Sequence, residues 1–93
     1  MSDHMIVNLR DVEDQAPKFG FSELQEARFP WRDLGASSTG FAFHRVKPGK
    51  RQGFAHRHEA AEEVYVVLSG SGRVKLDDEV KDLRQLDAIR VAP

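Results

Sequence analysis

The stretch from His56 to Gly70, "HRHEAAEEVYVVLSG", decides both the fold and the chemistry that this sequence predicts. Side chains at positions i and i+2 of a strand point to one face, so His56 and His58 project together while Arg57 points away. The residues "EAAE" that follow suffice for a tight reversal, after which a strand beginning at Glu63 returns beside the first. The pattern therefore predicts two imidazoles and one carboxylate on one side of a hairpin.

Two histidines and one carboxylate, with positions left for water or substrate, are the ligand set expected of a non-haem iron, and they also suit manganese, nickel or zinc. A bare His-x-His pair also occurs on surfaces and in ordinary core hydrogen bonds. Two additions favour a metal: the glutamate stands where a hairpin returns it, and the apolar strand after it ends in glycine, as at the opening of a barrel lumen. The predicted metal ligands are His56, His58 and Glu63.

Glu62 is the alternative carboxylate ligand, because neighbouring residues on a strand point to opposite faces. Glu63 is favoured since Tyr65 and Val67 then share its side. On that side the Tyr65 hydroxyl is placed to contact a bound ligand, which makes Tyr65 a predicted substrate-lining residue.

Three other residues near the motif, Phe54, Arg45 and Arg90, each have two possible interpretations, whereas His44 has one. Phe54, two residues before the first histidine, either faces the lumen and shapes a pocket or packs in the core. Arg45 and Arg90 bind a carboxylate if they point inward, whereas solvated arginines on a barrel are more common. His44 has the opposite strand phase from Phe43 and is interpreted as structural.

The longer stretch "GKRQGFAHRHEAAEEVYVVLSGSG" resembles the first motif of the cupins: a glycine, several residues, His-x-His, three or four residues, glutamate, six residues and a glycine. The flanks "FAFHRVKPG" and "GRVKLDDEVKDLRQLDAIRVAP" resemble the strand before that motif and the hairpin after it. The resemblance covers roughly residues 39–93. The matching positions are His56, His58, Glu63 and Gly70, with Gly49 one residue further from His56 than usual.

The resemblance implies an all-β, antiparallel jelly-roll barrel with a divalent metal in its lumen, often dimeric. It implies dioxygenase, isomerase, decarboxylase or related chemistry, or ligand binding alone. The second cupin motif usually opens with glycine before the aspartate, where this chain has Leu86 before Asp87, and it continues to a further histidine that this sequence does not contain. The chain stops at Pro93 directly after a strand-like alternation, which predicts a barrel incomplete at the C-terminus. Either the chain is a fragment, or the fourth ligand is missing, as in some small bacterial cupins, which this sequence resembles. No catalytic residue is assigned, because the sequence offers no general base apart from the ligands.

Length and patterning predict one small domain, since the 93 residues are 40% apolar and 31% charged. Period-two alternation in "TGFAFHRV", "EVYVVL", "GRVKLD" and "DAIRVA" predicts short strands joined by tight turns. Within that domain, residues 1–38 are predicted to form an N-terminal arm with an edge strand, and residues 39–93 the barrel.

Charge and composition restrict the partners. A net charge of −1 argues against a nucleic-acid binder. The chain has no cysteine, no run that is apolar enough to span a membrane and no signal-peptide pattern, so a cytoplasmic location without a membrane partner is predicted. One acid-free stretch is either a solvated loop or a positive rim that attracts an anionic small molecule; it carries Arg45, Lys47, Lys50, Arg51 and Arg57.

The small core and the aromatic N-terminal arm predict a homodimer in which residues 6–30 cover a sheet of the partner. Trp31 is interpreted as a core or dimer-interface residue. The predicted function is a small metal-binding cupin that acts on or binds a small organic molecule, with anions favoured. The alternatives are a ligand-binding or sensor cupin without metal chemistry, and a structural subunit with a vestigial site.

Overall fold

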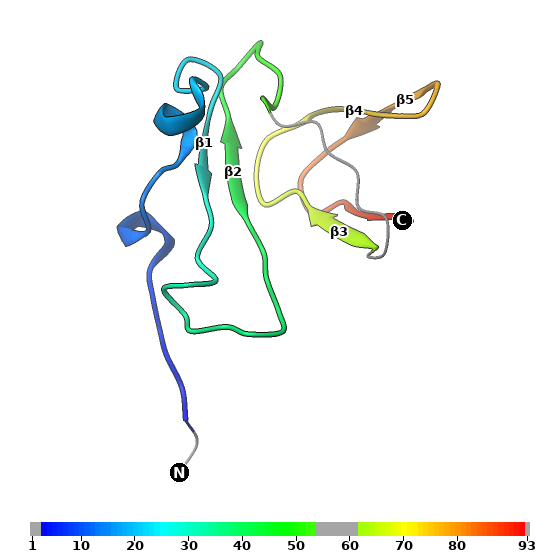
Figure 1. Cartoon of the computed structure of the whole chain (residues 1–93). Helices are drawn as coiled ribbons and strands as arrows, with labels where there is room; N and C mark the ends of the chain where they lie inside the picture. Colours follow the sequence, from blue (N-terminus) through cyan, green and yellow to red (C-terminus); the bar gives the residue numbers. More distant parts are fainter. Residues whose placement is uncertain (1–2, 54–61, 93) are drawn as a thin grey trace. The chain divides into compact units, whose positions relative to one another are not determined.

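The computed structural model describes residues 3–53 and 62–92, and its regular structure is antiparallel β with two short 3-10 helices (Figure 1). The described strands form three two-stranded sheets, with orders β1–β2, β3–β6 and β4–β5, and every pairing is antiparallel. The predicted all-β antiparallel class is therefore confirmed. The elements are η1 (Leu9–Asp11), η2 (Ala16–Phe19), β1 (Gln25–Arg28), β2 (Phe43–Val46), β3 (Glu63–Val66), β4 (Gly72–Leu76), β5 (Glu79–Leu83) and β6 (Ala88–Val91).

The chain divides into two compact units, an N-terminal unit of Met1–Ala55 and a C-terminal unit of His56–Pro93. β2 pairs with β1 and so belongs to the N-terminal unit. The organisation predicted from the sequence, one domain with an arm over residues 1–38 and a barrel over residues 39–93, stays a prediction. The four strands predicted from period-two alternation are confirmed as β2, β3, β4 and β6. No helix among the described residues is long and apolar enough to cross a membrane.

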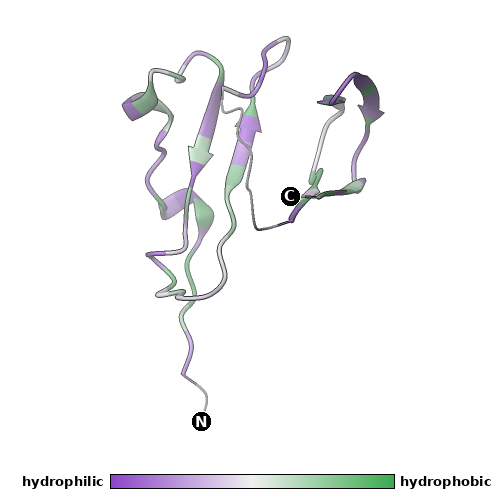
Figure 2. Ribbon diagram, turned by 45° about the vertical axis from the view of Figure 1, so that its right-hand side comes forward, coloured by the Kyte–Doolittle hydropathy of each residue, from purple (hydrophilic) through white to green (hydrophobic). Residues whose placement is uncertain are grey.

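The N-terminal unit has a small buried core on one face of its sheet. In β1 the side chains of Gln25 and Ala27 are 1% and 0% exposed, while Glu26 and Arg28 between them point to the other face. Val12 and Ala16 join this core, and each is less than 5% exposed. Figure 2 shows hydrophilic and hydrophobic bands following one another along these paired strands, as expected of strands with one buried face.

The side chain of Asp14 connects η2 to β1 through hydrogen bonds. Its Oδ1 accepts hydrogen bonds from the backbone N–H groups of Ala16, at 3.0 Å, and of Ala27, at 2.9 Å. The bond from Ala27 is the main cause that lowers the pKa of Asp14 below its ordinary value, against an opposing effect of burial. The ionised carboxylate thus satisfies two backbone donors that the turn would otherwise leave unpaired.

The C-terminal unit contains one hairpin and one non-local strand pair. In the hairpin, β4 and β5 are joined at Asp77 and Asp78, and Asp77 has a φ of 55°, a left-handed conformation that aspartate tolerates better than most residues. By contrast, β3 pairs with β6, although the whole β4–β5 hairpin separates them in sequence. The pairing of β3 is therefore long-range.

A tight turn at residues 84–87 leads into β6. The Arg84 N–H donates to Asp87 Oδ2 at 2.9 Å, and the Leu86 N–H donates to the Val67 carbonyl at 2.7 Å. Leu86 has a φ of 69°. This left-handed conformation costs a leucine energy but suits glycine, which gives a physical reason for the glycine that usually precedes this aspartate in the second motif.

Candidate metal site and its surroundings

Glu63 and Tyr65 lie on one face of β3, and that face is the more covered one. They stand opposite Val91 and Ile89 of β6, and Glu63, Val91 and Ile89 are all half-buried. Val64, which points to the other face, is 67% exposed. Glu63 therefore projects from the better covered side of the β3–β6 sheet.

Glu62 belongs to the opposite face. Its Oε2 lies 3.1 Å from Nη1 of Arg90, and the two side chains are 59% and 65% exposed. The carboxylate of Glu62 is thus committed to a solvent-exposed ion pair with β6. Arg90 takes the solvated position that is common for barrel arginines.

Tyr65 orients the carboxylate of Glu63, because its hydroxyl donates a hydrogen bond to Glu63 Oε2. Partial burial, followed by this hydrogen bond and the negative charge of Glu63, raises the pKa of Tyr65 to about 12. The phenol therefore keeps its proton at neutral pH and acts as a donor.

The other two predicted ligands, His56 and His58, and the predicted pocket residue Phe54 lie outside the described residues. Within residues 3–53 and 62–92, no group of three or more His, Cys, Asp or Glu side chains is arranged to hold a metal ion. The described part of the chain thus holds one of the three predicted ligands. The donor type fits, since a carboxylate oxygen suits every metal predicted from the sequence.

The segment that leads to the histidine motif is anchored at Gly53, three residues before His56. Its N–H donates to Oε1 of the buried Gln25 at 2.6 Å. A Cβ atom at Gly53 would lie 2.6 Å from carbons of the Phe21 ring, closer than real Cβ contacts come. Only glycine fits between this amide and this ring without a shift, and the anchor has no signal in the sequence.

The same glutamine also contacts His44. Because Gln25 Oε1 accepts from a backbone N–H, the amide must present Nε2 to Nδ1 of His44, at 2.9 Å. In this arrangement the amide donates to Nδ1 of His44. The ring also packs edge-on against Phe29, with centroids 6.0 Å apart. These contacts agree with the structural role predicted for His44.

Arg45 shares one face of the β1–β2 sheet with Phe43. Its guanidinium lies 3.5 Å from Glu26 Oε2 and 6.0 Å from the centroid of the Phe43 ring, and its side chain is 69% exposed. Arg45 remains a predicted substrate-lining residue. Sequence reasoning did not single out Glu26 or its second partner Arg28, although the alternation in "QEAR" indicates that both point to one face.

A comparison with protein families shows which family these strands and the histidine motif belong to. The Cupin domain model matches residues 42–93, which is more than half of the chain, so the chain belongs to the cupin family. The match starts directly before β2 and includes β3 to β6 together with the histidine motif. No curated protein and no solved structure gives a significant match. Cupin domains often bind a divalent metal or a small ligand, and this is the class of function that the family supports.

Proposed function

We propose that this cupin holds a divalent transition metal through His56, His58 and Glu63, and that the metal binds or converts a small organic molecule, with anions favoured. The observation that carries the proposal is the difference between two adjacent glutamates. Glu63 projects from the covered face of β3 and accepts a hydrogen bond from Tyr65, whereas Glu62 is paired with Arg90 on the exposed face. Ligating carboxylates are commonly oriented by such hydrogen bonds.

The metal, when bound, supplies Lewis acidity or oxygen activation. The chain's own contribution at this site is orientation: Tyr65 keeps its proton at neutral pH and holds the carboxylate of Glu63 in one direction. This behaviour suits dioxygenase, isomerase or related chemistry, but it equally suits a ligand-binding or sensor cupin without metal chemistry. Turnover of a substrate in a screen with the native metal separates the enzyme from the sensor.

The first experiment is elemental analysis of the protein as isolated, with Glu63→Gln compared with Glu62→Gln as a matched control. Both variants remove one negative charge from neighbouring positions, but only the first removes a proposed ligand. We expect Glu63→Gln to weaken metal binding by more than about tenfold, and Glu62→Gln to leave it unchanged. Equal metal content in the two variants would refute the assignment of Glu63. Full metal retention in His58→Ala would refute the histidine pair.

We also propose that the protein is a homodimer in which residues 6–30 cover a sheet of the partner. Large apolar side chains of the N-terminal unit support this proposal, because Ile6 is 85% exposed, Phe19 56% and Phe41 52%. Sedimentation velocity at micromolar concentration tests it. A stable monomer at that concentration overturns the dimer.

A further inference from the structure

One hollow, with a volume of about 660 Å³, lies over the face of the β1–β2 sheet opposite the buried core. Its floor comes from alternate residues of the two strands, and its side from the segment that enters η1. The volume is within the range of roughly 300–1,000 Å³ that is usual for small-molecule sites. We call it the arginine hollow, and its lining is Val7, Asn8, Leu9, Arg10, Glu26, Arg28, Phe43 and Arg45.

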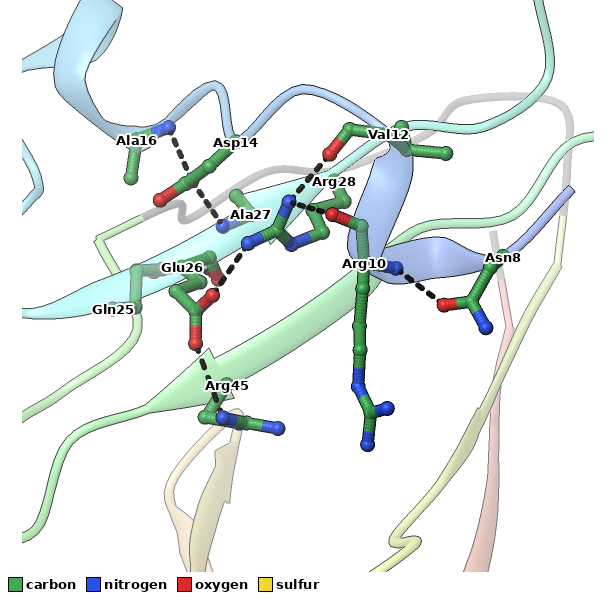
Figure 3. Close-up of polar contacts among 10 residues, drawn as sticks. All are labelled: Asn8, Arg10, Val12, Asp14, Ala16, Gln25, Glu26, Ala27, Arg28 and Arg45. Carbon is green, nitrogen blue, oxygen red and sulfur yellow. Dashed lines mark hydrogen bonds and ion pairs between the residues drawn. The ribbon is translucent and has the colours of Figure 1, made fainter. Parts of the chain in front are cut away.

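Arg28 is the structural part of this hollow. Its Nη1 donates to the carbonyls of Val12 and of Arg10, the latter at 3.4 Å, and its Nη2 donates to Glu26 Oε1 at 2.7 Å (Figure 3). The side chain is only 18% exposed. Arg28 thus ties η1 to β1, and its donors are largely committed to the protein.

The guanidinium groups of Arg10 and Arg45, unlike that of Arg28, have N–H donors available for a ligand. The side chain of Arg10 makes no hydrogen bond or ion pair with the described residues, and Figure 3 draws no contact at its guanidinium. Arg45 is 3.5 Å from Glu26 and 69% exposed, so most of its donors face solvent. Two guanidinium groups with available donors therefore line the same hollow.

The charges of the lining define the ligand. Three arginines and one glutamate leave an excess of two positive charges around the hollow. Guanidinium groups bind phosphate and carboxylate through paired N–H donors, and a phosphate offers several oxygens to two guanidiniums at once. Phe43, Val7 and Leu9 supply apolar surface beside these charges.

We propose that the arginine hollow binds a small dianion of the phosphate monoester class, with Arg10 and Arg45 on the phosphate and Phe43 beside the organic group. In the absence of a bound anion, Glu26 holds the side chains of Arg28 and Arg45 in position. Its carboxylate also competes with the anion for the guanidinium N–H donors, which limits the affinity of the hollow for phosphate. The site lies wholly within the N-terminal unit. The proposal is therefore independent of the metal ligands.

The test is a titration of the full-length chain, as isolated and again after metal removal with a chelator, followed by two-dimensional NMR. Inorganic phosphate is the first probe, phenyl phosphate the second and succinate the dicarboxylate comparison. We expect saturable shifts at Arg10, Glu26 and Arg45 that persist after metal removal. Phenyl phosphate should bind more tightly than phosphate because of Phe43, and succinate more weakly than either.

Variants decide which groups bind. Arg10→Ala and Arg45→Ala should each weaken phosphate binding about tenfold, as expected for the loss of one charge-assisted contact. Arg32→Ala is the matched control, since Arg32 lies in the same unit, over the Trp31 ring at 5.0 Å, and outside the hollow. The Arg32→Ala variant should bind phosphate with the same affinity as the unaltered protein.

The Arg45→Lys variant distinguishes a site that requires the guanidinium geometry from non-specific attraction by positive charge. It also replaces Arg45→Ala as the test if the alanine variant does not fold. Lysine retains the charge but loses the planar fork, so we expect several-fold weaker binding. The proposal is overturned if phosphate shifts none of the hollow's signals, if Arg32→Ala loses as much affinity as Arg45→Ala, or if Arg45→Lys binds as well as the unaltered protein. It is also overturned if the shifts vanish when the metal is removed.

Discussion

The two units of the chain are both antiparallel, but they differ in how their strands are held. In the N-terminal unit the described residues include a buried core of Val12, Ala16, Gln25 and Ala27. In the C-terminal unit no residue between 62 and 92 is buried. Strand pairing there is supported by backbone hydrogen bonds and half-buried faces. The same secondary structure thus rests on packing in one unit and mainly on pairing in the other.

Two carboxylates, Glu26 on β1 and Glu63 on β3, also differ in the groups that hold them. Glu26 of β1 contacts Arg28 at 2.7 Å and Arg45 at 3.5 Å, so its charge is balanced by arginines. Glu63 of β3 accepts a hydrogen bond from the neutral phenol of Tyr65. A neutral donor orients a carboxylate without cancelling its charge, whereas an arginine does both. This difference agrees with the proposed roles of Glu63 as a metal ligand and of Glu26 as a positioning residue.

The largest effect on stability is expected at the packed anchor of the N-terminal unit. Gly53→Ala places a Cβ 2.6 Å from the Phe21 ring and disturbs the hydrogen bond to Gln25, so we expect a loss of about 2–3 kcal/mol in the free energy of unfolding. The measurement is urea unfolding. Gly40→Ala is the control, because a Cβ there meets nothing within 4 Å. Equal losses in both variants would refute the tight packing at Gly53 on which this part of the comparison rests.

The next effect concerns the carboxylate that fastens η2 to β1. Asp14→Ala leaves the buried Ala27 N–H without its acceptor, which should cost about 1–2 kcal/mol at neutral pH. Because the folded pKa of Asp14 lies below its ordinary value of 3.8, its ionic contribution is present above pH 3.8 and is lost as the pH falls through the folded pKa. The stability gap between the unaltered protein and Asp14→Ala should therefore narrow in acid. The exposed Asp11 provides the control, since Asp11→Ala should show no such gap.

A smaller effect of opposite sign is expected in the C-terminal unit. Leu86 is 75% exposed and has a φ of 69°, so Leu86→Gly relieves a left-handed leucine while losing little buried surface. After the entropy cost of glycine, a gain of about 0.5 kcal/mol remains. Leu68→Gly, at another exposed leucine without positive φ, should instead destabilise the unit. A thermal melt that shows the same sign for both changes would contradict the backbone argument.

The smallest effect appears only in alkaline solution. Tyr65 is the single tyrosine, so its phenolate absorbance reports one group. In metal-free protein we expect its pKa at about 12 rather than 10.0, and Glu63→Gln should lower it while burial keeps it above 10.0. The folded pKa is raised, so the contribution of Tyr65 to stability is complete below pH 10.0 and is lost as the pH rises through about 12. An unshifted titration would contradict both the partial burial of Tyr65 and its hydrogen bond to Glu63.

Local patterns predicted the elements whose physics is local. The alternation in "GRVKLD" and the acidic pair after it predict the β4–β5 hairpin because both the faces and the turn depend on adjacent residues. The phase argument that set Glu63 and Tyr65 on the side opposite Glu62 has the same basis, and the described strand has this arrangement. The metal assignment itself stays a prediction, since its histidines lie outside the described residues.

The sequence by itself determined the family, the strand periods and the candidate ligands, because these depend on residue type and spacing over a few positions. Only the tertiary structure decided that Gln25 joins His44 to Gly53, 28 residues further along, and that β3 pairs with β6 across an intervening hairpin. It also brought Arg10 of η1 to the same hollow as Arg45 of β2. Such contacts are chosen by chain closure and by the burial of polar groups that must find partners, and neither is visible in a local pattern.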